Sequence, residues 1–454
     1  MSDLPRGWHI TSLGKIGLIQ SGVGFPNEAQ GLTSGDYPVY KVGDVSRGVL
    51  QAKGNLKSAN NYVSKETAAS LKGYIFPSGS TLFAKIGEAL KLNRRAFVLR
   101  EGLADNNVMG YKAESGVSDR FIYHYLRTQD LAAFSRSTTV PSIRKGDVEE
   151  LVVLLPPADE QTRIAAKLDE LLAQVDILKA RIDGIPALLK RFRQSVLAAA
   201  VSGRLTESRE ESDLPSGWQL VDFSSVIIDL RYGTAQKCDY NGGSIGVLRI
   251  PNIGENCINL NDLKFSDFSL NEINKLSLKK GDVLLIRSNG SVELVGKSAM
   301  VGPREEGLLF AGYLIRVRLN TEKVIPEYVN YWLKSPAVRQ VIEMTARSTS
   351  GVNNINSEEI KSLIFTMPPL PEQSEIVRRV EQLFTFADQL EARVKAAQAR
   401  IDRLTQSILA KAFCGELVPQ DPNDEPASVL LERIKTQRAA APKAKRGRRS
   451  AIAD

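Results

Sequence analysis

Two long stretches of this chain carry apolar residues at alternating steps of four and three positions. The first runs unbroken from Ile164 to Val196 and the second from Ile376 to Ile408. Heptad spacing of this kind places apolar side chains along one narrow stripe of a helix. A helix that lies on its own globular domain, which is the alternative, normally buries a wider face. The pattern therefore favours two long helices that pack on each other as a coiled coil.

The contact between these helices is expected to use the apolar positions of the two stripes. They are Ile164, Leu168, Leu171, Val175, Leu178, Ile376, Val380, Leu383, Leu390 and Val394. A Pro-Pro pair followed by Glu-Gln precedes each stripe and is typical of a helix start with an acidic first turn. Gly203 and Gly415 follow the stripes and are natural helix ends.

The stripes belong to a longer internal repeat with an offset of 212 residues. The segment LPPADEQTRIAAKLDELLAQVD (155–176) aligns with MPPLPEQSEIVRRVEQLFTFAD (367–388), and RFRQSVLAAAVSGRL (191–205) aligns with RLTQSILAKAFCGEL (403–417). The openings LPRGW (4–8) and LPSGW (214–218) also match, at an offset of 210. The chain is therefore two copies of one unit, with similar edges and divergent middles.

The divergent middles have the pattern of α/β (mixed α+β) domains. Strand-like runs include YPVYKV, STLFAKI, GVLRI and DVLLIRS, and amphipathic helices are expected at 120–129 and 326–335. The aromatic residues of those helices are expected to lie in the core. We predict two globular domains, related by pseudo-two-fold symmetry and separated by two long antiparallel coiled-coil helices. The expected boundaries are 1–155 and 214–367 for the domains, 156–206 and 368–418 for the helices, 207–213 for a linker, and 419–454 for a C-terminal segment with a basic, disordered tail.

Charge alone does not identify a nucleic-acid-binding protein here. The net charge is +8, but residues 432–454 account for +6 of it, which leaves +2 for the other 431 residues. The tail KAKRGRR is able to bind phosphate through counterion release, or it is simply a solvated end.

The sequence contains no recognisable set of catalytic residues. The segment GSVELVGKS (290–298) has five residues between its glycines, whereas a phosphate-binding loop requires four. Two histidines and three scattered cysteines offer neither a metal site nor a disulfide framework. No apolar run is long enough to span a membrane, and the N-terminus lacks the layout of a signal peptide, so a cytoplasmic location is expected. Three classes remain: a DNA recogniser, a protein scaffold that binds no DNA, and an enzyme whose site is assembled from divergent loops.

The arrangement of these motifs resembles the specificity (S, HsdS) subunits of type I restriction–modification enzymes. The similarity rests on the LPxGW openings, on each Pro-Pro-x-x-Glu-Gln helix, and on the QS-[V/I]-L-A-x-A-x-x-G-x-L helix ends. It extends from Leu4 to about Ile434 and is greatest to the class IA members. The resemblance implies a non-catalytic subunit whose two target-recognition domains each read one half of a bipartite double-stranded DNA sequence, while the helices set the spacer.

The resemblance also implies the partners. Two modification (methyltransferase, M) subunits would dock around the helices, and two ATP-dependent restriction (translocase/nuclease, R) subunits would join them. This chain would need no cofactor of its own, because those partners bind S-adenosylmethionine and ATP with Mg²⁺. Adenine methylation or remote cleavage would then be the partners' chemistry, which this chain directs.

Candidate DNA-contacting residues are basic or amide side chains, and one carboxylate, that align between the copies or lie in loops. Lys41, Asp44 and Lys85 of the first copy align with Arg249, Asn252 and Arg287 of the second. The loop candidates are Arg94, Arg95, Arg136, Arg144, Lys145, Arg347, Asn353 and Asn354. Such side chains position a protein on phosphates or read base edges in the major groove. The DNA sequence itself cannot be derived from them.

Overall fold

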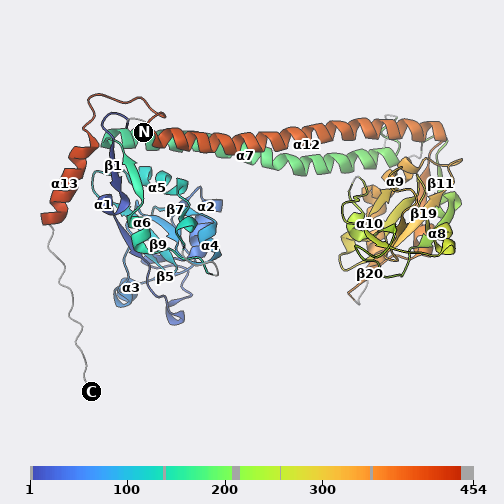
Figure 1. Cartoon of the computed structure of the whole chain (residues 1–454), viewed down its shortest axis with the longest axis horizontal. Helices are drawn as coiled ribbons and strands as arrows, with labels where there is room; N and C mark the ends of the chain where they lie inside the picture. The colour runs from blue at the N-terminus through green and yellow to red at the C-terminus, as the bar shows by residue number, and fades with distance from the viewer. Residues whose placement is uncertain (1–3, 136–139, 207–214, 256, 348–350, 441–454) are drawn as a thin grey trace, which may run out of the picture. The chain divides into compact units, whose positions relative to one another are not determined.

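Two helices of 44 residues link the parts of this chain: α7 (Ala158–Val201) and α12 (Leu370–Phe413). The computed structural model, drawn in Figure 1, describes residues 4–135, 140–206, 215–255, 257–347 and 351–440. The chain divides into two compact units, unit 1 with residues 1–180 and 398–454, and unit 2 with residues 181–397. Each unit holds one globular domain and a part of both long helices. The mixed α/β class predicted from the sequence is confirmed.

Ion pairs join α7 to α12 within each unit. In unit 1, Lys179 Nζ lies 3.3 Å from Asp402 Oδ1. In unit 2, Arg193 Nη2 lies 2.6 Å from Asp388 Oδ1 and 3.1 Å from Glu391 Oε2. Later residues of α7 therefore meet earlier residues of α12, which is the antiparallel pairing that the repeat predicts.

The predicted helix contact is largely buried. Ile164, Leu168, Val175, Ile376, Val380 and Val394 are buried, and Leu171, Leu383 and Leu390 are half-buried. Leu178 differs from the prediction, because 47% of it is exposed. A straight helix rotates by about 20° per heptad relative to a strict seven-residue repeat, so a stripe position drifts out of the contact. At its N-terminal end the same stripe is fully buried at Ile164 and Leu168.

The domain of unit 1 is built on a five-stranded sheet in the order β2-β9-β6-β7-β4, with a three-stranded sheet β5-β3-β8 beside it and a separate pair β1-β10. The strands are β1 (His9–Ser12), β2 (Gly17–Ser21), β3 (Tyr37–Tyr40), β4 (Asn55–Leu56), β5 (Tyr62–Val63), β6 (Thr81–Ala84), β7 (Arg95–Val98), β8 (Leu103–Ala104), β9 (Val108–Ala113) and β10 (Val152–Leu155). The helices are α1 (Leu13–Ile16), α2 (Val42–Gln51), α3 (Lys65–Leu71), α4 (Glu88–Lys91), α5 (Asp119–Thr128) and α6 (Lys145–Glu149).

The domain of unit 2 repeats this plan. Its main sheet has the order β12-β19-β15-β17, and it is accompanied by β14-β13-β18 and by the pairs β11-β21 and β16-β20. The strands are β11 (Gln219–Asp222), β12 (Ile227–Tyr232), β13 (Ile245–Leu248), β14 (Lys264–Ser266), β15 (Val283–Ile286), β16 (Ser288–Asn289), β17 (Ser298–Met300), β18 (Leu309–Phe310), β19 (Leu314–Leu319), β20 (Asn353–Asn354) and β21 (Ile364–Met367). The helices are α8 (Leu270–Leu276), α9 (Pro326–Lys334), α10 (Pro336–Ala346) and α11 (Ser357–Lys361).

The strands and helices predicted in the divergent middles are confirmed. The four strand-like runs form β3, β6, β13 and β15, and the two amphipathic segments form α5 and α9. Their aromatic residues lie in the core as expected, except that Tyr331 is only half-buried and packs edge-on against Phe384 of α12.

The two sequence motifs at the edges of the repeat meet at the start of each long helix, a contact that we call the helix-start junction. In unit 1, Trp8 Nε1 donates to Glu160 Oε2 at 3.0 Å, and in unit 2, Trp218 Nε1 donates to Glu372 Oε2 at 2.8 Å. The LPxGW and Pro-Pro-x-x-Glu-Gln motifs are therefore two halves of one hydrogen-bonded contact.

The glutamine of the motif ties the same junction to the domain helix. Gln161 accepts from the backbone N–H of Ser118, the N-cap of α5, at 2.8 Å. Gln373 accepts from the N–H of Ile325, the N-cap of α9, at the same distance. Both amide groups also donate to a proline carbonyl at the helix start. Each globular domain is thus fixed to its long helix by buried side chains that the two copies share.

The glycine after each long helix is required by a close approach of the LPxGW proline. Gly203 and Gly415 have φ values of +77° and +83°. A Cβ on Gly203 would lie 2.3 Å from Pro215 Cγ, and one on Gly415 would lie 2.6 Å from Pro5 Cγ. Each LPxGW motif therefore contacts the start of one long helix and the end of the other within its unit.

A C-terminal helix, α13 (Ala427–Ala440), belongs to unit 1 and lies beside α1 (Figure 1). Arg438 donates to the carbonyls of Gly14 and Gly17 at 2.7 and 2.9 Å and pairs with Glu114. Arg163 of α7 pairs with Asp424 just before this helix, at 2.6 Å. The tail predicted to be disordered, residues 441–454, lies outside the described residues.

Candidate nucleic-acid interface

A groove with a volume of about 770 Å³ opens at the ends of several strands in unit 2. Its basic lining residues are Lys237, Arg249, Lys264 and Arg287, and none of the described residues that line it is acidic. Tyr232, at the end of β12, and Tyr313, just before β19, lie among these cations. Cations interleaved with aromatic rings are typical of surfaces that bind nucleic acid.

Arg287 is held in this groove by contacts on several sides. Its backbone N–H donates to the carbonyl of Tyr313 at 2.8 Å, and its own carbonyl accepts from Ile355 at 2.9 Å. Its guanidinium carbon lies 4.4 Å from the centre of the Tyr232 ring, and its Nε donates to Asn354 Oδ1 at 3.2 Å. Stacking on a ring and a fixed Nε bond restrict the side chain to one orientation.

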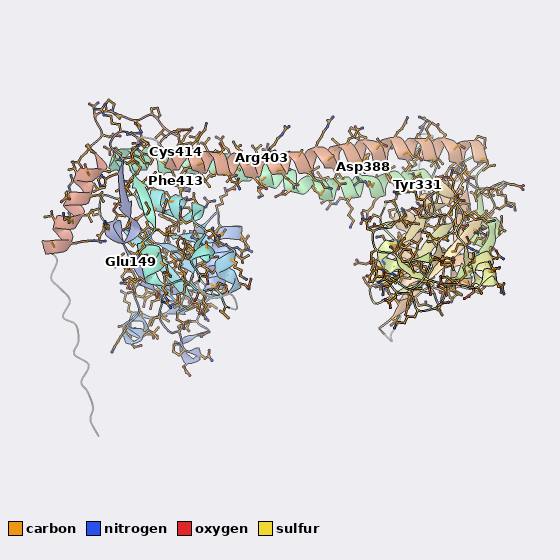
Figure 2. All side chains as sticks on the ribbon, in the orientation of Figure 1. Glu149, Tyr331, Asp388, Arg403, Phe413 and Cys414 are labelled. Carbon is orange, nitrogen blue, oxygen red and sulfur yellow. The ribbon has the colours of Figure 1, made fainter. Side chains whose placement is uncertain are left out.

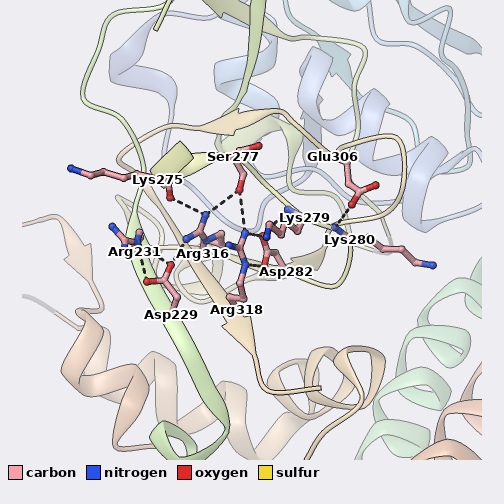
Figure 3. A network of polar contacts seen from close by, with 10 residues as sticks. All are labelled: Asp229, Arg231, Lys275, Ser277, Lys279, Lys280, Asp282, Glu306, Arg316 and Arg318. Atoms are coloured by element: carbon pink, nitrogen blue, oxygen red, sulfur yellow. Dashed lines mark hydrogen bonds and ion pairs between the residues drawn. The ribbon is translucent and has the colours of Figure 1, made fainter. Parts of the chain in front are cut away.

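A network of ion pairs joins β12 and β19 to Asp282, the residue before β15, and braces the strands that carry these groups (Figure 3). Arg316, only 1% exposed, donates to Asp229 and to the carbonyls of Lys275 and Ser277. Arg318 Nη2 pairs with Asp282 Oδ2 at 2.7 Å. Because these cations already have partners, their charge supports the sheet and is not available to a ligand.

Two of the predicted DNA-contacting residues hold backbone in place instead. Asn252, 1% exposed, accepts from the N–H of Arg249 and donates to the carbonyls of Asn259 and Asp262. Its counterpart Asp44 is buried and accepts from the N–H groups of Lys41 and Asn60. A short polar side chain after a strand is suited both to capping a helix and to reading a base. In these two residues the hydrogen-bonding groups are already used for capping.

Arg95 also differs from the prediction. It is 2% exposed, and its guanidinium donates to the backbone carbonyls of Leu126 and Gln129 at 3.2 and 3.1 Å. Burial lowers its pKa to about 10. Its planar set of N–H groups stabilises the end of α5, so Arg95 is a structural residue of the domain interior.

The equivalent region of unit 1 has the same backbone frame with different side chains. The N–H of Lys85 donates to the carbonyl of Asn107, and its carbonyl accepts from Ile143, as for Arg287 in unit 2. Val23 forms an isolated β-bridge with Asp105 in unit 1, and Thr234 forms the equivalent β-bridge with Ala311 in unit 2. Burial raises the pKa of Asp105, and the charges of Lys41 and Lys85 oppose that shift. The first domain therefore has a carboxylate that feels the charges of Lys41 and Lys85, at the β-bridge where the second domain has the methyl group of Ala311.

The remaining candidates fall into three groups. Arg144, Lys145 and Arg347 are exposed at helix ends, and Arg94 is half-buried. Asn353 donates to the carbonyls of Asn289 and Gly290, while Asn354 accepts from Arg287, so both amides lie beside the groove of unit 2. Arg136 lies outside the described residues.

The sequence did not reveal Lys237, Lys264, Tyr232 or Tyr313 as groove residues. Lys264 lies on β14 with its Nζ 5.1 Å from the centre of the Tyr240 ring. These positions carry no motif, and only the pairing of β13 with β14 and of β12 with β19 brings them together. Figure 2 draws the described side chains of both domains, and sequence position alone does not single these residues out among them.

The described residues contain no group of three or more His, Cys, Asp or Glu side chains suited to a metal ion. No helix in the described part of the chain is both long and apolar enough to cross a membrane.

The sequence model of the type I restriction modification DNA specificity domain matches residues 5–187 and again residues 215–397. The specificity subunit of the type I restriction enzyme EcoKI from Escherichia coli K12 is 35% identical over 96% of this chain and 97% of its own length. The StySPI specificity subunit from Salmonella potsdam is 32% identical over 99% of each chain.

Solved structures share the fold. A chain from a study of assembly and conformational transition of the type I R-M system superposes with a TM-score of 0.67, at 20% identity, over 92% of this chain and all of its own. The HsdS subunit from Thermoanaerobacter tengcongensis gives 0.58 at 22% identity, over 91% and 98%. Two domain matches and two relatives above 30% identity across nearly the whole length leave one assignment: the chain belongs to the family of type I restriction–modification specificity subunits.

Proposed function

We propose that this chain recognises a bipartite DNA target for a type I complex without catalysing a reaction itself, each domain reading one half. The observation that carries the proposal is the repeated backbone frame around Lys85 and Arg287. Both residues occupy the same position relative to neighbouring strands, yet the surrounding side chains differ. A shared frame with different side chains is what two readers of two different half-sites require.

The proposed recognition separates positioning from reading. Lys237 and Lys264 line the groove of unit 2 as flexible cations, which suits contact with phosphates. Arg287 has one fixed orientation, which suits contact with a base edge. In unit 1, Lys41 and Lys85 would contact DNA, with Asp105, which feels their charges, as an acceptor.

The helices would dock the partners and set the spacer between half-sites. Both long helices expose large apolar side chains, among them Leu178, Leu188, Phe386 and Leu404, each 47–60% exposed. Exposed apolar groups on a paired helix suit a protein partner. Two modification subunits and two restriction subunits would fill this role, bringing S-adenosylmethionine and ATP with Mg²⁺.

The test is to purify the chain with and without a methyltransferase partner and to map methylated adenines in cells that contain both. The proposal expects one bipartite motif and sequence-dependent DNA retention in moderate salt. Substitutions around Lys85 should alter one half of the motif, and substitutions around Arg287 should alter the other. A protein scaffold would show no sequence-dependent retention, and an enzyme would turn over a substrate without the partner.

A further inference from the structure

The guanidinium group of Arg287 is positioned in the groove, and its terminal nitrogens make no hydrogen bond to any residue that the structure describes. Among the described residues, the hydrogen bonds of this side chain involve only Nε, which donates to Asn354 Oδ1 at 3.2 Å. The stacked ring of Tyr232 is itself fixed, because its hydroxyl accepts from the N–H of Ser357 at 3.0 Å. The two terminal nitrogens, with four N–H donors between them, therefore remain available in a defined plane.

This geometry distinguishes Arg287 from the other cations of the groove. Arg249 already donates to the carbonyl of Asp262 and pairs with its carboxylate at 2.9 Å. Lys264 lies over the Tyr240 ring and 4.0 Å from Asp239. An ammonium on a flexible stem is a point charge, whereas a fixed guanidinium presents two parallel donors.

A pair of parallel donors matches one base better than the others. Guanine presents two acceptors, O6 and N7, side by side in the major groove, while adenine and cytosine place an amino donor there. We propose that Arg287 reads a guanine in the half-site of the second domain, with Tyr232 and Asn354 as its positioning residues. This inference rests on the proposed DNA recognition and names one contact within it.

The first domain is not expected to share this contact. Lys85 occupies the equivalent backbone position, and Asp105 stands where the second domain has Ala311. A lysine and a carboxylate cannot present the same two donors in one plane, so the two halves read different bases at this point.

The first experiment compares methylation motifs of the complex with wild-type chain, Arg287→Gln and Lys264→Ala. With Arg287→Gln, the preference of the complex for guanine at one position of one half-site should fall by about 10- to 100-fold, while the other half-site stays unchanged. Lys264→Ala is the matched control from the same groove, and it should weaken all sequences alike. An unchanged motif with Arg287→Gln, or relaxation of a base other than guanine, overturns the proposal.

The second experiment uses the wild-type chain, so it does not depend on whether a variant folds. Half-site duplexes carry 7-deazaguanine in place of each guanine in turn, which removes only the N7 acceptor. Binding should fall at one guanine in the half-site of the second domain, and Arg287→Gln should bind that duplex and its unmodified parent equally. Equal binding of all duplexes by the wild-type complex overturns the guanine contact. Absence of any sequence-dependent binding would instead refute the proposed function.

Discussion

The hydroxyl of Thr206 completes the helix-start junction of unit 2, and we predict that Thr206→Val destabilises this unit. Glu372 Oε2 accepts from Trp218, and Oε1 accepts from Thr206 Oγ1 at 2.9 Å. Removing the hydroxyl leaves one carboxylate oxygen of a half-buried side chain without its protein donor. Loss of a hydrogen-bond donor to a charged group lowers the free energy of unfolding by about 1–3 kcal/mol. Because Glu372 is partly exposed, we expect a loss of about 1 kcal/mol.

Unit 1 already shows what this change produces. Val418 stands at the repeat position of Thr206, and Glu160 Oε1 is buried without a hydrogen-bond partner in the described chain. Burial raises the pKa of Glu160, although the hydrogen bond from Trp8 opposes this shift. The variant should leave Glu372 Oε1 in the same situation, without the donor that Thr206 now supplies.

The assay is differential scanning calorimetry of the full chain, with Thr206→Ser as the control that keeps the hydroxyl. A loss of about 1 kcal/mol in a unit of this size corresponds to a shift of about 2–4 °C in the transition of unit 2. The serine variant should lie close to the wild type. If the valine and serine variants unfold at the same temperature, the hydroxyl contributes nothing and the reasoning about the junction is wrong.

Four further changes test other parts of the structure. Val418→Thr should supply the missing donor of unit 1 and raise its free energy of unfolding by about 0.5–1.5 kcal/mol, measured by the same calorimetry; no change would mean that the hydroxyl does not reach Glu160. Lys264→Ala should reduce the slope of log affinity against log salt by about 1, and an unchanged slope would remove it from the phosphate contacts. Burial raises the pKa of Asp169, but hydrogen bonds from His124 and Arg120 lower it further, from 3.8 to about 2. The stability that the Asp169 carboxylate contributes is therefore present above pH 3.8 and lost towards pH 2. Asp169→Asn should therefore flatten acid unfolding in that window, and a denaturation curve with the wild-type pH dependence would contradict this. An insertion of seven residues into one long helix keeps the apolar stripe aligned and adds about 10 Å, which is close to three base pairs, so the mapped methylation motif should gain a longer spacer; an unchanged spacer would refute the role of the helices as a ruler.

The long helices were predictable because their signal is local and repeated. Heptad spacing indicates an apolar stripe over many turns. Ile164, Leu168, Ile376 and Val380 of this stripe are buried, and Ile376 and Val380 lie in the core of the domain of unit 2. Leu178 is the exception, because the spacing of apolar residues along a helix does not show over which of its turns the partner helix covers the stripe. The predicted strands β3, β6, β13 and β15 were likewise recognisable from short apolar runs.

The groove was less predictable because its residues come from distant strands. Tyr232 is the last residue of β12 and Arg287 directly follows β15, and in the sheet β19 lies between these two strands. Polarity alone also misled, since Asn252 and Asp44 cap backbone turns and Arg95 binds buried carbonyls. A buried polar residue with saturated hydrogen bonds has the same letter in the sequence as one that faces a ligand.

The contrast between similar edges and divergent middles in the repeat has a physical origin in the helix-start junction. The contact of Trp8 with Glu160 is buried and that of Trp218 with Glu372 is part-buried. In both, the donor and the acceptor must match, so a change in one partner leaves the other unsatisfied. The groove lies on other residues of the same domains, at strand ends where side chains such as Arg287, Ala311 and Tyr313 change without touching that junction. Attachment to the helices and the proposed recognition of DNA therefore depend on separate sets of residues. Two copies are thus able to keep one mode of attachment while residues elsewhere in the domains come to differ, as Asp105 and Ala311 do at equivalent β-bridges.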